Sequence, residues 1–471
     1  MDMAYISTRG QVAPIGFIDA VLMGLADDGG LLVPQHIPQV SGDTLRQWQR
    51  LSYRDLALEV FSLYVGDEIP RADLKRLVDD SYGTFRDPGV TPVRPLRDGL
   101  HVLELFHGPT FAFKDVALQF LGNLYAYISR KKDSIIHILG ATSGDTGASA
   151  IEGVRGKEGI RICILHPNGK VSKVQELQMT TVGDDNVLNL AVEGTFDDCQ
   201  RMIKELFADV DFKRRYHLRA INSINIARIL AQTVYYFYAY FRLAEQGVAG
   251  GATAASNPVN FSVPTGNFGD IFAGYLAGRM GLPVGRLVLA TNENNILERF
   301  VNEGVYEPGE FRGTYSPSMD IQVASNFERY LYYLYGEDAG ATAAVMTQFK
   351  AEGRVSVPTE KLRQVQADFS ACSVRNEECL DTISEYHDRH GYLLDPHTAC
   401  GVAAADRLAA AGEATVTLST AHPAKFDEAI RLRGIRQEYP PQIAALFDKP
   451  QAKTVVGGET AEIKAQLEQF F

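Results

Sequence analysis

The sequence has few cysteines, no long apolar run and no excess of basic residues. Its five cysteines form no CxxC pair, which favours buried, reduced thiols over a disulfide framework. The most apolar stretch, residues 234–241, is far too short to span a bilayer. The N-terminus lacks the basic start and apolar core of a signal peptide. We therefore expect a cytoplasmic protein without a membrane partner.

Basic charge is also scarce, because 46 Lys and Arg face 58 Asp and Glu and the formal net charge is −12. This balance argues against nucleic acid as a partner. A small anionic ligand remains possible where helix N-termini or a few basic side chains supply local positive charge. His387 and His390 form an HxxH pair with no further ligands in sequence, so we expect a solvated helix face and no metal site.

Strand-like and helix-like segments alternate along the chain of 471 residues from about residue 100 onward. This alternation predicts an α/β fold with open, mostly parallel sheets and helices on both faces. Residues 1–95 are predicted to be mainly helical, with helices over 43–65 and 70–82. The predicted units are an N-terminal domain (1–95), a large α/β region (96–295 and 413–430) with a smaller subdomain at about 130–225, a mainly helical insertion (296–412) and a C-terminal tail (431–471). A loose connection is expected at 247–256.

The first candidate loop, HGPTFAFKD (107–115), places Lys114 after an apolar strand and among aromatic residues. Burial lowers the pKa of a lysine, because an apolar environment disfavours the ammonium ion. A neutral amine is what covalent attack on a carbonyl requires. The alternative is an ordinary surface lysine at a helix N-terminus, where the helix dipole is unfavourable for a cation.

A second loop, GATSGDTGAS (140–149), lies between a predicted strand and a predicted helix. Its glycines and hydroxyl groups suit anion binding at a helix N-terminus. The alternative is a tight crossover in which Ser143 or Asp145 caps the helix. The loop is not a Walker A motif, because the GK[ST] ending is missing.

The third loop, PTGNFGD (264–270), has the character of a phosphate cup. Gly266 and Gly269 allow close approach of the backbone to a ligand, and the next helix adds its dipole. Asp270 would repel a phosphate, so we expect it to cap the helix and to point away. A plain glycine-rich turn is the alternative.

Thr420 follows the last predicted strand, in the segment LSTAHPAKF (418–426). Its hydroxyl can donate to or accept from a ring nitrogen, and the alternative is a local turn before the proline. A lysine amine, a glycine cup, a polar loop and a hydroxyl group are together the parts that hold pyridoxal 5′-phosphate.

Several of these segments resemble the threonine synthases, a family of fold type II (β-family) pyridoxal-phosphate enzymes. The resemblance rests on YISTRG (5–10), HGPTFAFKD (107–115), ATSGDTGASA (141–150), NSINIARILAQTVYYF (222–237), PTGNFGDIFAGYLA (264–277), SMDIQVASNFERYLYYL (318–334) and STAHPAKF (419–426). It covers about residues 5–426. It implies conversion of O-phospho-L-homoserine and water into L-threonine and phosphate, by γ-elimination followed by β-addition of water.

The resemblance also implies roles for residues at the site. Lys114 would bind the cofactor aldehyde covalently and move protons on the substrate. Asp145 would lie near the cofactor O3′, either sharing a proton there or standing slightly away. Thr420 would meet the pyridine nitrogen. The cofactor phosphate would be held by the backbone of Gly266, Asn267, Phe268 and Gly269, and the substrate carboxylate would lie near Ser143 and Thr146.

The substrate carries its own phosphate, so a second anion site is expected. Arg228, with Asn225, is the candidate, because a guanidinium binds phosphate bidentately. The alternative for Arg228 is a structural salt bridge. Lys170 is a weaker candidate, Asn326 is expected to face the site, and Thr8 and Arg9 could reach it.

Other functions remain open at this point. A threonine or serine dehydratase would share the lysine and the glycine cup but would need no second phosphate site. A catalytically silent homologue would be expected to lack one of these features. A nucleotide-binding module lacks its fingerprint here. The chain is expected to be a monomer or a homodimer.

Overall fold

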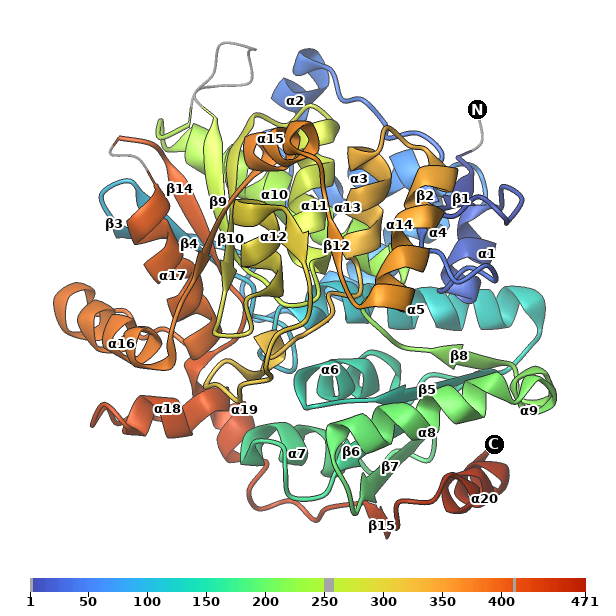
Figure 1. The fold of residues 1–471 in the computed structure, drawn as a ribbon. Helices are drawn as coiled ribbons and strands as arrows, with labels where there is room; N and C mark the ends of the chain where they lie inside the picture. The colour runs from blue at the N-terminus through green and yellow to red at the C-terminus, as the bar shows by residue number, and fades with distance from the viewer. Residues whose placement is uncertain (1–2, 250–257, 410–411) are drawn as a thin grey trace.

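The computed structural model describes residues 3–249, 258–409 and 412–471. Two open sheets carry helices on their faces (Figure 1), so the predicted fold class is confirmed. Most of the loose connection expected at 247–256 lies outside the described residues. Within the described ranges, no helix combines the length and the apolar character needed to cross a membrane.

The larger sheet has six strands in the order β13-β10-β9-β14-β4-β3. All neighbours are parallel except β3 and β4. The strands are β3 (Val93–Arg97), β4 (Leu100–Glu104), β9 (Val259–Pro264), β10 (Val284–Thr291), β13 (Phe369–Ser373) and β14 (Thr415–Ser419).

Alternate residues of β10 face two different apolar cores. Leu287 and Leu289 belong to the core beneath α10 (Ile226–Glu245), whereas Val288 and Ala290 belong to the core beneath α17 (Pro396–Leu408). Because successive side chains of a strand point to opposite faces, this sheet is covered on both sides. Further helices around it are α11 (Gly269–Arg279), α12 (Ile296–Glu303), α13 (Phe327–Leu334), α14 (Ala339–Glu352), α15 (Thr359–Asp368), α16 (Asn376–His390) and α18 (Asp427–Arg431).

The smaller sheet has five parallel strands in the order β15-β7-β6-β5-β8. They are β5 (Ile136–Ala141), β6 (Ile160–Pro167), β7 (Val187–Val192), β8 (Leu218–Ala220) and β15 (Thr454–Val456). Its helices are α6 (Asp145–Val154), α7 (Lys173–Thr180), α8 (Phe196–Ala208) and α9 (Val210–Arg215). Figure 1 shows α5 (Lys114–Lys132) running between the two sheets, packed against α6 and α10.

The N-terminal region is largely helical, as predicted, and packs against α5 and α10. It consists of β1 (Tyr5–Ser7), α1 (Phe17–Met23), β2 (Leu32–Pro34), α2 (Gly42–Trp48), α3 (Tyr53–Val65) and α4 (Arg71–Tyr82). The helix predicted over 43–65 is split in two. Ser52 begins the second helix by accepting a hydrogen bond from the backbone N–H of Asp55 at 3.2 Å.

Two segments differ from their predicted roles. Residues 296–412 are mainly helical, but they also supply the edge strand β13, so they are part of the larger sheet. The predicted tail, 431–471, contains α19 (Pro441–Ala444), β15 and α20 (Thr460–Phe470). Because β15 pairs with β7 and α20 packs on α8, this segment completes the smaller sheet.

Candidate active site

Three neighbouring strands of the larger sheet end side by side. The loop after β4 carries Lys114, the loop after β9 carries Gly266–Gly269, and Thr420 directly follows β14. The loop after β5, in the smaller sheet, reaches the same place with Asp145. Ligands of open parallel sheets bind at the carboxyl ends of strands, and here two such edges meet.

Lys114 is the first residue of α5 and is largely buried, with 12% of its side chain exposed. Its loop lies against the Thr420 segment, because the backbone N–H of Phe113 donates to the Thr420 carbonyl at 2.8 Å. Burial lowers the pKa of the Lys114 amine to about 8, and the nearby charges of Arg228 and Lys425 act in the same direction. The predicted lowering of this pKa is therefore confirmed.

The loop that precedes Lys114 is shaped by Asp115. This buried carboxylate accepts from the Thr110 backbone N–H at 2.7 Å and from the Thr110 hydroxyl at 2.6 Å. A Cβ at Gly108 would lie 2.4 Å from Cβ of Asp115, so only glycine fits there. The lysine loop is thus held by its own sequence neighbours.

Asp145 carries an ionised carboxylate between two lysines. Its Oδ1 lies 2.7 Å from Nζ of Lys425, and its Oδ2 lies 3.7 Å from Nζ of Lys114. Gln175 donates to Oδ1 at 2.8 Å. Burial alone would raise the pKa of Asp145, but the two lysines hold it well below its ordinary range.

These contacts bear on two expectations about the second loop. Neither Ser143 nor Asp145 caps α6; the Thr142 hydroxyl accepts from the N–H groups of Gly144 and Gly147 instead. For Asp145, the pairing with Lys425 disfavours a shared proton and leaves the other expectation, a place slightly away from O3′, as the prediction. Ser143 is exposed and Thr146 is half-buried, and the side chain of neither forms a hydrogen bond to another described residue.

Lys425 is the residue that the sequence analysis missed. Its side chain is fully buried, and besides Asp145 it donates to the Thr110 carbonyl at 2.7 Å. It therefore ties β14's loop to the lysine loop and to α6. Lys425 lies in STAHPAKF (419–426), but nothing in the local sequence shows that this lysine is buried by segments distant in the chain.

The glycine loop offers backbone N–H groups that lack protein partners. Within the part of the chain that the structure describes, the N–H groups of Gly266, Asn267, Phe268 and Gly269 donate to no other residue. A Cβ at Gly266 would lie 3.0 Å from the Ser318 carbonyl oxygen. Phe268, not a glycine, is in the left-handed region with φ +63°, and it begins α11. Such strain is typical of ligand-binding loops.

Asn326 supports the glycine loop through two hydrogen bonds to one of its carbonyl groups. Its backbone N–H and its side-chain Nδ2 both donate to the Asn267 carbonyl, at 3.0 and 3.1 Å. Its Oδ1 accepts from the buried Arg329. The side chain is fully buried in these contacts, so Asn326 supports the loop, and its place facing the site stays a prediction.

Asp270 points away from the loop, toward Tyr235 and Tyr236 on α10. Both tyrosine hydroxyls donate to its Oδ1, Tyr236 at 3.0 Å. Burial raises the pKa of Asp270 to about 7. The expected orientation is therefore observed, but the expected cap is not, because no side chain caps α11.

Thr420 is nearly buried, and its hydroxyl forms no hydrogen bond to another described residue. The local turn that was the alternative for this residue is therefore not formed by its side chain. A hydroxyl left free at the end of β14 suits a ring nitrogen of a ligand.

Arg228 and Asn225, predicted as a pair, differ in their contacts. Nε and Nη1 of Arg228 are buried without a hydrogen-bond partner among the described residues, and no described carboxylate forms a salt bridge with it. Burial lowers the pKa of Arg228 to about 10. Asn225 instead caps α10 and donates both amide hydrogens, to the Val21 carbonyl and the Tyr125 hydroxyl. Of the two residues, Arg228 is therefore the one that keeps side-chain nitrogens without a partner among the described residues.

The weaker candidates have other contacts. Lys170 is exposed and donates to the Gly194 carbonyl at 2.9 Å. The Thr8 hydroxyl donates to Glu328 at 2.7 Å, and Arg9 donates to the same carboxylate through Nε at 2.9 Å and Nη2 at 2.8 Å. Glu328 lies on α13, which begins just after Asn326. The N-terminal segment thus supports the glycine loop from a distance.

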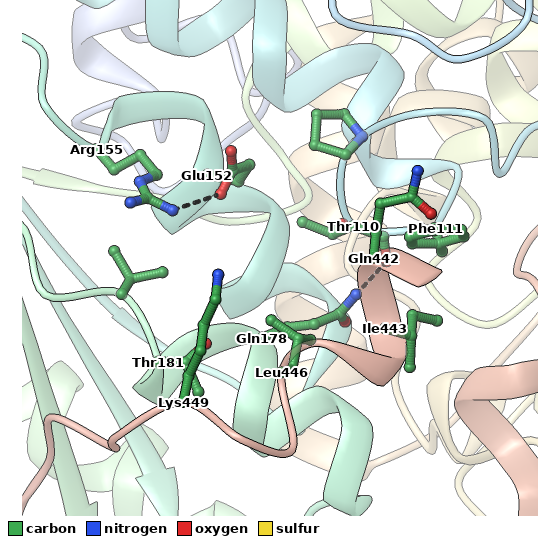
Figure 2. Close-up of a pocket in the computed structure, with 12 residues that line it drawn as sticks. Thr110, Phe111, Glu152, Arg155, Gln178, Thr181, Gln442, Ile443, Leu446 and Lys449 are labelled. Carbon is green, nitrogen blue, oxygen red and sulfur yellow. Dashed lines mark hydrogen bonds and ion pairs between the residues drawn. The ribbon is translucent and has the colours of Figure 1, made fainter. Parts of the chain in front are cut away.

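A pocket of about 70 Å³ lies against the lysine loop (Figure 2). Thr110 and Phe111 line it together with residues of α6, α7 and the segment after α18, including Arg155 and Lys449. Gln178, another lining residue, donates to the Thr110 carbonyl at 2.9 Å. This space is too small for a cofactor of pyridoxal-phosphate size, so it is not the candidate active site.

These observations fit pyridoxal 5′-phosphate. The free N–H groups suit its phosphate, the amine of Lys114 suits its aldehyde, and the hydroxyl of Thr420 suits its ring nitrogen.

Three family models match the chain. Residues 4–82 match the family described as "Threonine synthase N terminus", residues 85–419 match "Pyridoxal-phosphate dependent enzyme", and residues 398–467 match "Threonine synthase, C-terminal".

Among curated relatives, threonine synthase of Schizosaccharomyces pombe is 48% identical over 91% of this chain and 89% of its own length. That of Pseudomonas aeruginosa is 46% identical over 99% of this chain and 98% of its own length. The crystal structure of PLP-bound threonine synthase from Brucella melitensis has a TM-score of 0.95 at 44% identity, covering 100% of this chain and 99% of that chain. The yeast threonine synthase structure has a TM-score of 0.93 at 42% identity, covering 99% and 98%.

Proposed function

The chain belongs to the threonine synthase family of pyridoxal-phosphate-dependent enzymes, and we propose that its site converts O-phospho-L-homoserine and water into L-threonine and phosphate. The observation that carries the proposal is a buried arginine, Arg228, which has no counter-ion among the described residues and lies near an amine of lowered pKa. A site for pyridoxal phosphate alone needs one anion cradle, and the glycine loop supplies it. A second positive group suits a substrate that brings its own phosphate.

The residues that would hold the cofactor are those of the three strand ends. The N–H groups of Gly266–Gly269 would bind its phosphate, Thr420 its ring nitrogen, and Lys114 its aldehyde. Bound there, the cofactor withdraws electron density from the substrate carbons that lose protons. The protein supplies orientation, charge compensation and proton transfer.

Lys114 is the group that would carry protons between Cα, Cβ and Cγ of the substrate. An amine with a pKa of about 8 accepts and returns a proton near neutral pH more readily than an ordinary lysine. Asp145 steadies this amine at 3.7 Å, while Lys425 keeps Asp145 ionised. Ser143 and Thr146, which flank Asp145, are proposed to contact the substrate carboxylate.

Arg228 would bind the substrate phosphate and hold it as a leaving group. Its Nε and Nη1 have no partner among the described residues, and a guanidinium binds a phosphate with two hydrogen bonds. Burial strengthens this interaction, because the surroundings screen the charge poorly. Asn225 orients the start of the same helix.

The decisive assay measures phosphate and threonine formed from O-phospho-L-homoserine. We expect equal amounts of both products and no ammonia from L-threonine. Ammonia release from threonine or serine without phosphate release from phosphohomoserine would identify a dehydratase instead.

We also infer a cytoplasmic location, which the five buried, free cysteines support. The choice between a monomer and a homodimer stays open.

A further inference from the structure

One buried carboxylate, Asp395, has more contacts than a helix cap requires. It precedes α17 and accepts from the backbone N–H groups of His397 at 2.9 Å and Thr398 at 3.3 Å. It also binds both side chains: Nδ1 of His397 lies 2.8 Å from Oδ1, and the Thr398 hydroxyl donates to Oδ2. Asp395 is fully buried. One oxygen therefore orients His397 and the other orients Thr398.

The first branch leads to the glycine loop. The Ser318 backbone N–H donates to Nε2 of His397 at 3.1 Å, so Nε2 is the acceptor and Nδ1 carries the hydrogen that Asp395 receives. The ring is therefore held neutral and in one tautomer. Ser318 and Met319 in turn pack against Gly266, where a Cβ would lie only 3.0 Å from the Ser318 carbonyl oxygen.

The second branch leads to Thr420. Because the Thr398 hydroxyl gives its hydrogen to Asp395, its oxygen is left to accept from the Thr420 backbone N–H at 3.3 Å. The same oxygen lies 3.1 Å from Oγ of Ser419, the last residue of β14. This branch therefore sets the position of the residue that carries the free hydroxyl.

We propose that Asp395 is a positioning residue that sets both ends of the cofactor site, the glycine loop through His397 and Thr420 through Thr398. The inference rests on the proposed function, because it assigns the glycine loop to the cofactor phosphate and Thr420 to the ring nitrogen. It predicts that a change at His397 and a change at Thr398 have different effects on the bound cofactor. If Asp395 were only a structural cap, the two changes would have the same effect.

The first variant, His397→Phe, keeps the ring contact with Phe426, whose centroid lies 4.7 Å away, but removes both hydrogen bonds. We expect the dissociation constant of pyridoxal phosphate to rise about tenfold, the size of one lost hydrogen bond. The absorption band of the bound cofactor should keep its position. Titration of dialysed protein with pyridoxal phosphate, followed by fluorescence, measures the constant.

The second variant, Thr398→Val, should have the opposite profile. The dissociation constant should change less than about twofold, while the absorption band and its pH midpoint shift, because Thr420 moves relative to the ring. Thr398→Ser keeps the hydroxyl and should restore the band. Asp395→Asn should show both effects together.

The matched control is Asp338→Asn, which makes the same change at an exposed aspartate that caps α14. It should change neither the dissociation constant nor the band. If Asp395→Asn fails to fold, the two single-branch variants still test the proposal. Equal effects of His397→Phe and Thr398→Val on both measurements would overturn it.

A measurement without cofactor provides a further check. Selective ¹⁵N labelling of the histidines in the apoprotein, with His397→Phe to assign the signal, should show His397 protonated on Nδ1 only. An Nε2–H tautomer or a charged ring would overturn the proposal. If the wild-type protein binds no pyridoxal phosphate, the proposed function fails together with this inference. Binding without separable branches overturns this inference alone.

Discussion

Asp145 and Arg228 are both buried charges that act on Lys114, and the protein compensates them in opposite ways. Asp145 has Lys425, Lys114 and Gln175 within reach, whereas Nε and Nη1 of Arg228 have no partner among the described residues. A buried ion is tolerated when it is paired, and an unpaired one costs several kcal/mol. The contrast teaches that Asp145 is charge-compensated by described residues, while Arg228 is not, as our proposal of an external anion at Arg228 expects.

The largest expected effect concerns the residue on which both charges act. Lys114→Ala should abolish both turnover and the visible absorption of bound pyridoxal phosphate, because the covalent link and the proton carrier disappear together. An absorption spectrum and the phosphate-release assay measure this. Lys132→Ala, which removes an exposed lysine at the other end of α5, is the control and should behave like wild type. Retention of absorption and turnover in Lys114→Ala would refute the assignment.

The second prediction concerns Asp145, the buried charge that is paired with Lys425. Lys425→Met leaves Asp145 without its closest counter-ion, so the free energy of unfolding of the apoprotein should fall by about 3–5 kcal/mol. Urea denaturation measures it. Adding Asp145→Asn should recover most of the loss, because the unpaired charge is then removed. Lys464→Met, which breaks an exposed pair with Asp209, should cost less than about 1 kcal/mol. An equal loss in both lysine variants would contradict the account.

The third prediction concerns Arg228, the buried charge without a partner among the described residues. Arg228→Gln should raise KM for O-phospho-L-homoserine about 10- to 100-fold, as expected for a charged hydrogen bond to phosphate. The dissociation constant of pyridoxal phosphate should change less than about threefold, and the free energy of unfolding should not fall, because no protein partner is lost. Steady-state kinetics and urea denaturation test both halves. Unchanged kinetics would remove Arg228 from the site.

The smallest expected effect is a change in the pH dependence of cofactor capture by Lys114 when Arg228 is replaced. Only the neutral amine of Lys114 attacks an aldehyde, so the rate at which the apoprotein captures pyridoxal phosphate should rise about tenfold per pH unit below the pKa and level off above about 8. In Arg228→Gln a positive charge that lowers this pKa is gone, so the midpoint should move to higher pH. Stopped-flow absorbance measures the rate. A midpoint that moves to lower pH would contradict the electrostatic account.

Local patterns were sufficient to predict the loops but not the contacts between them. Lys114, Gly266–Gly269 and Thr420 each follow a strand, and the meeting of strand ends is a general property of parallel sheets. The burial of Lys425 and the double branch at Asp395 arise from segments that are distant in sequence. Nothing near either residue signals this role.

The same reason explains why the contacts of two asparagines were not predicted. Asn225 was proposed as a partner of Arg228, and Asn326 was expected to face the site. Their side chains are used within the protein, as a cap and as a brace for the Asn267 carbonyl. Strand β15 was missed for a related reason, because its short exposed sequence becomes a strand only by pairing with β7.

Borohydride reduction of the purified protein with pyridoxal phosphate, followed by peptide mapping, tests the central claim most directly. The account predicts a single stable pyridoxyl adduct on the peptide that contains Lys114, because this amine has a pKa lowered to about 8 and its loop lies against the Thr420 segment. An adduct on Lys425, on another lysine or on none would contradict it.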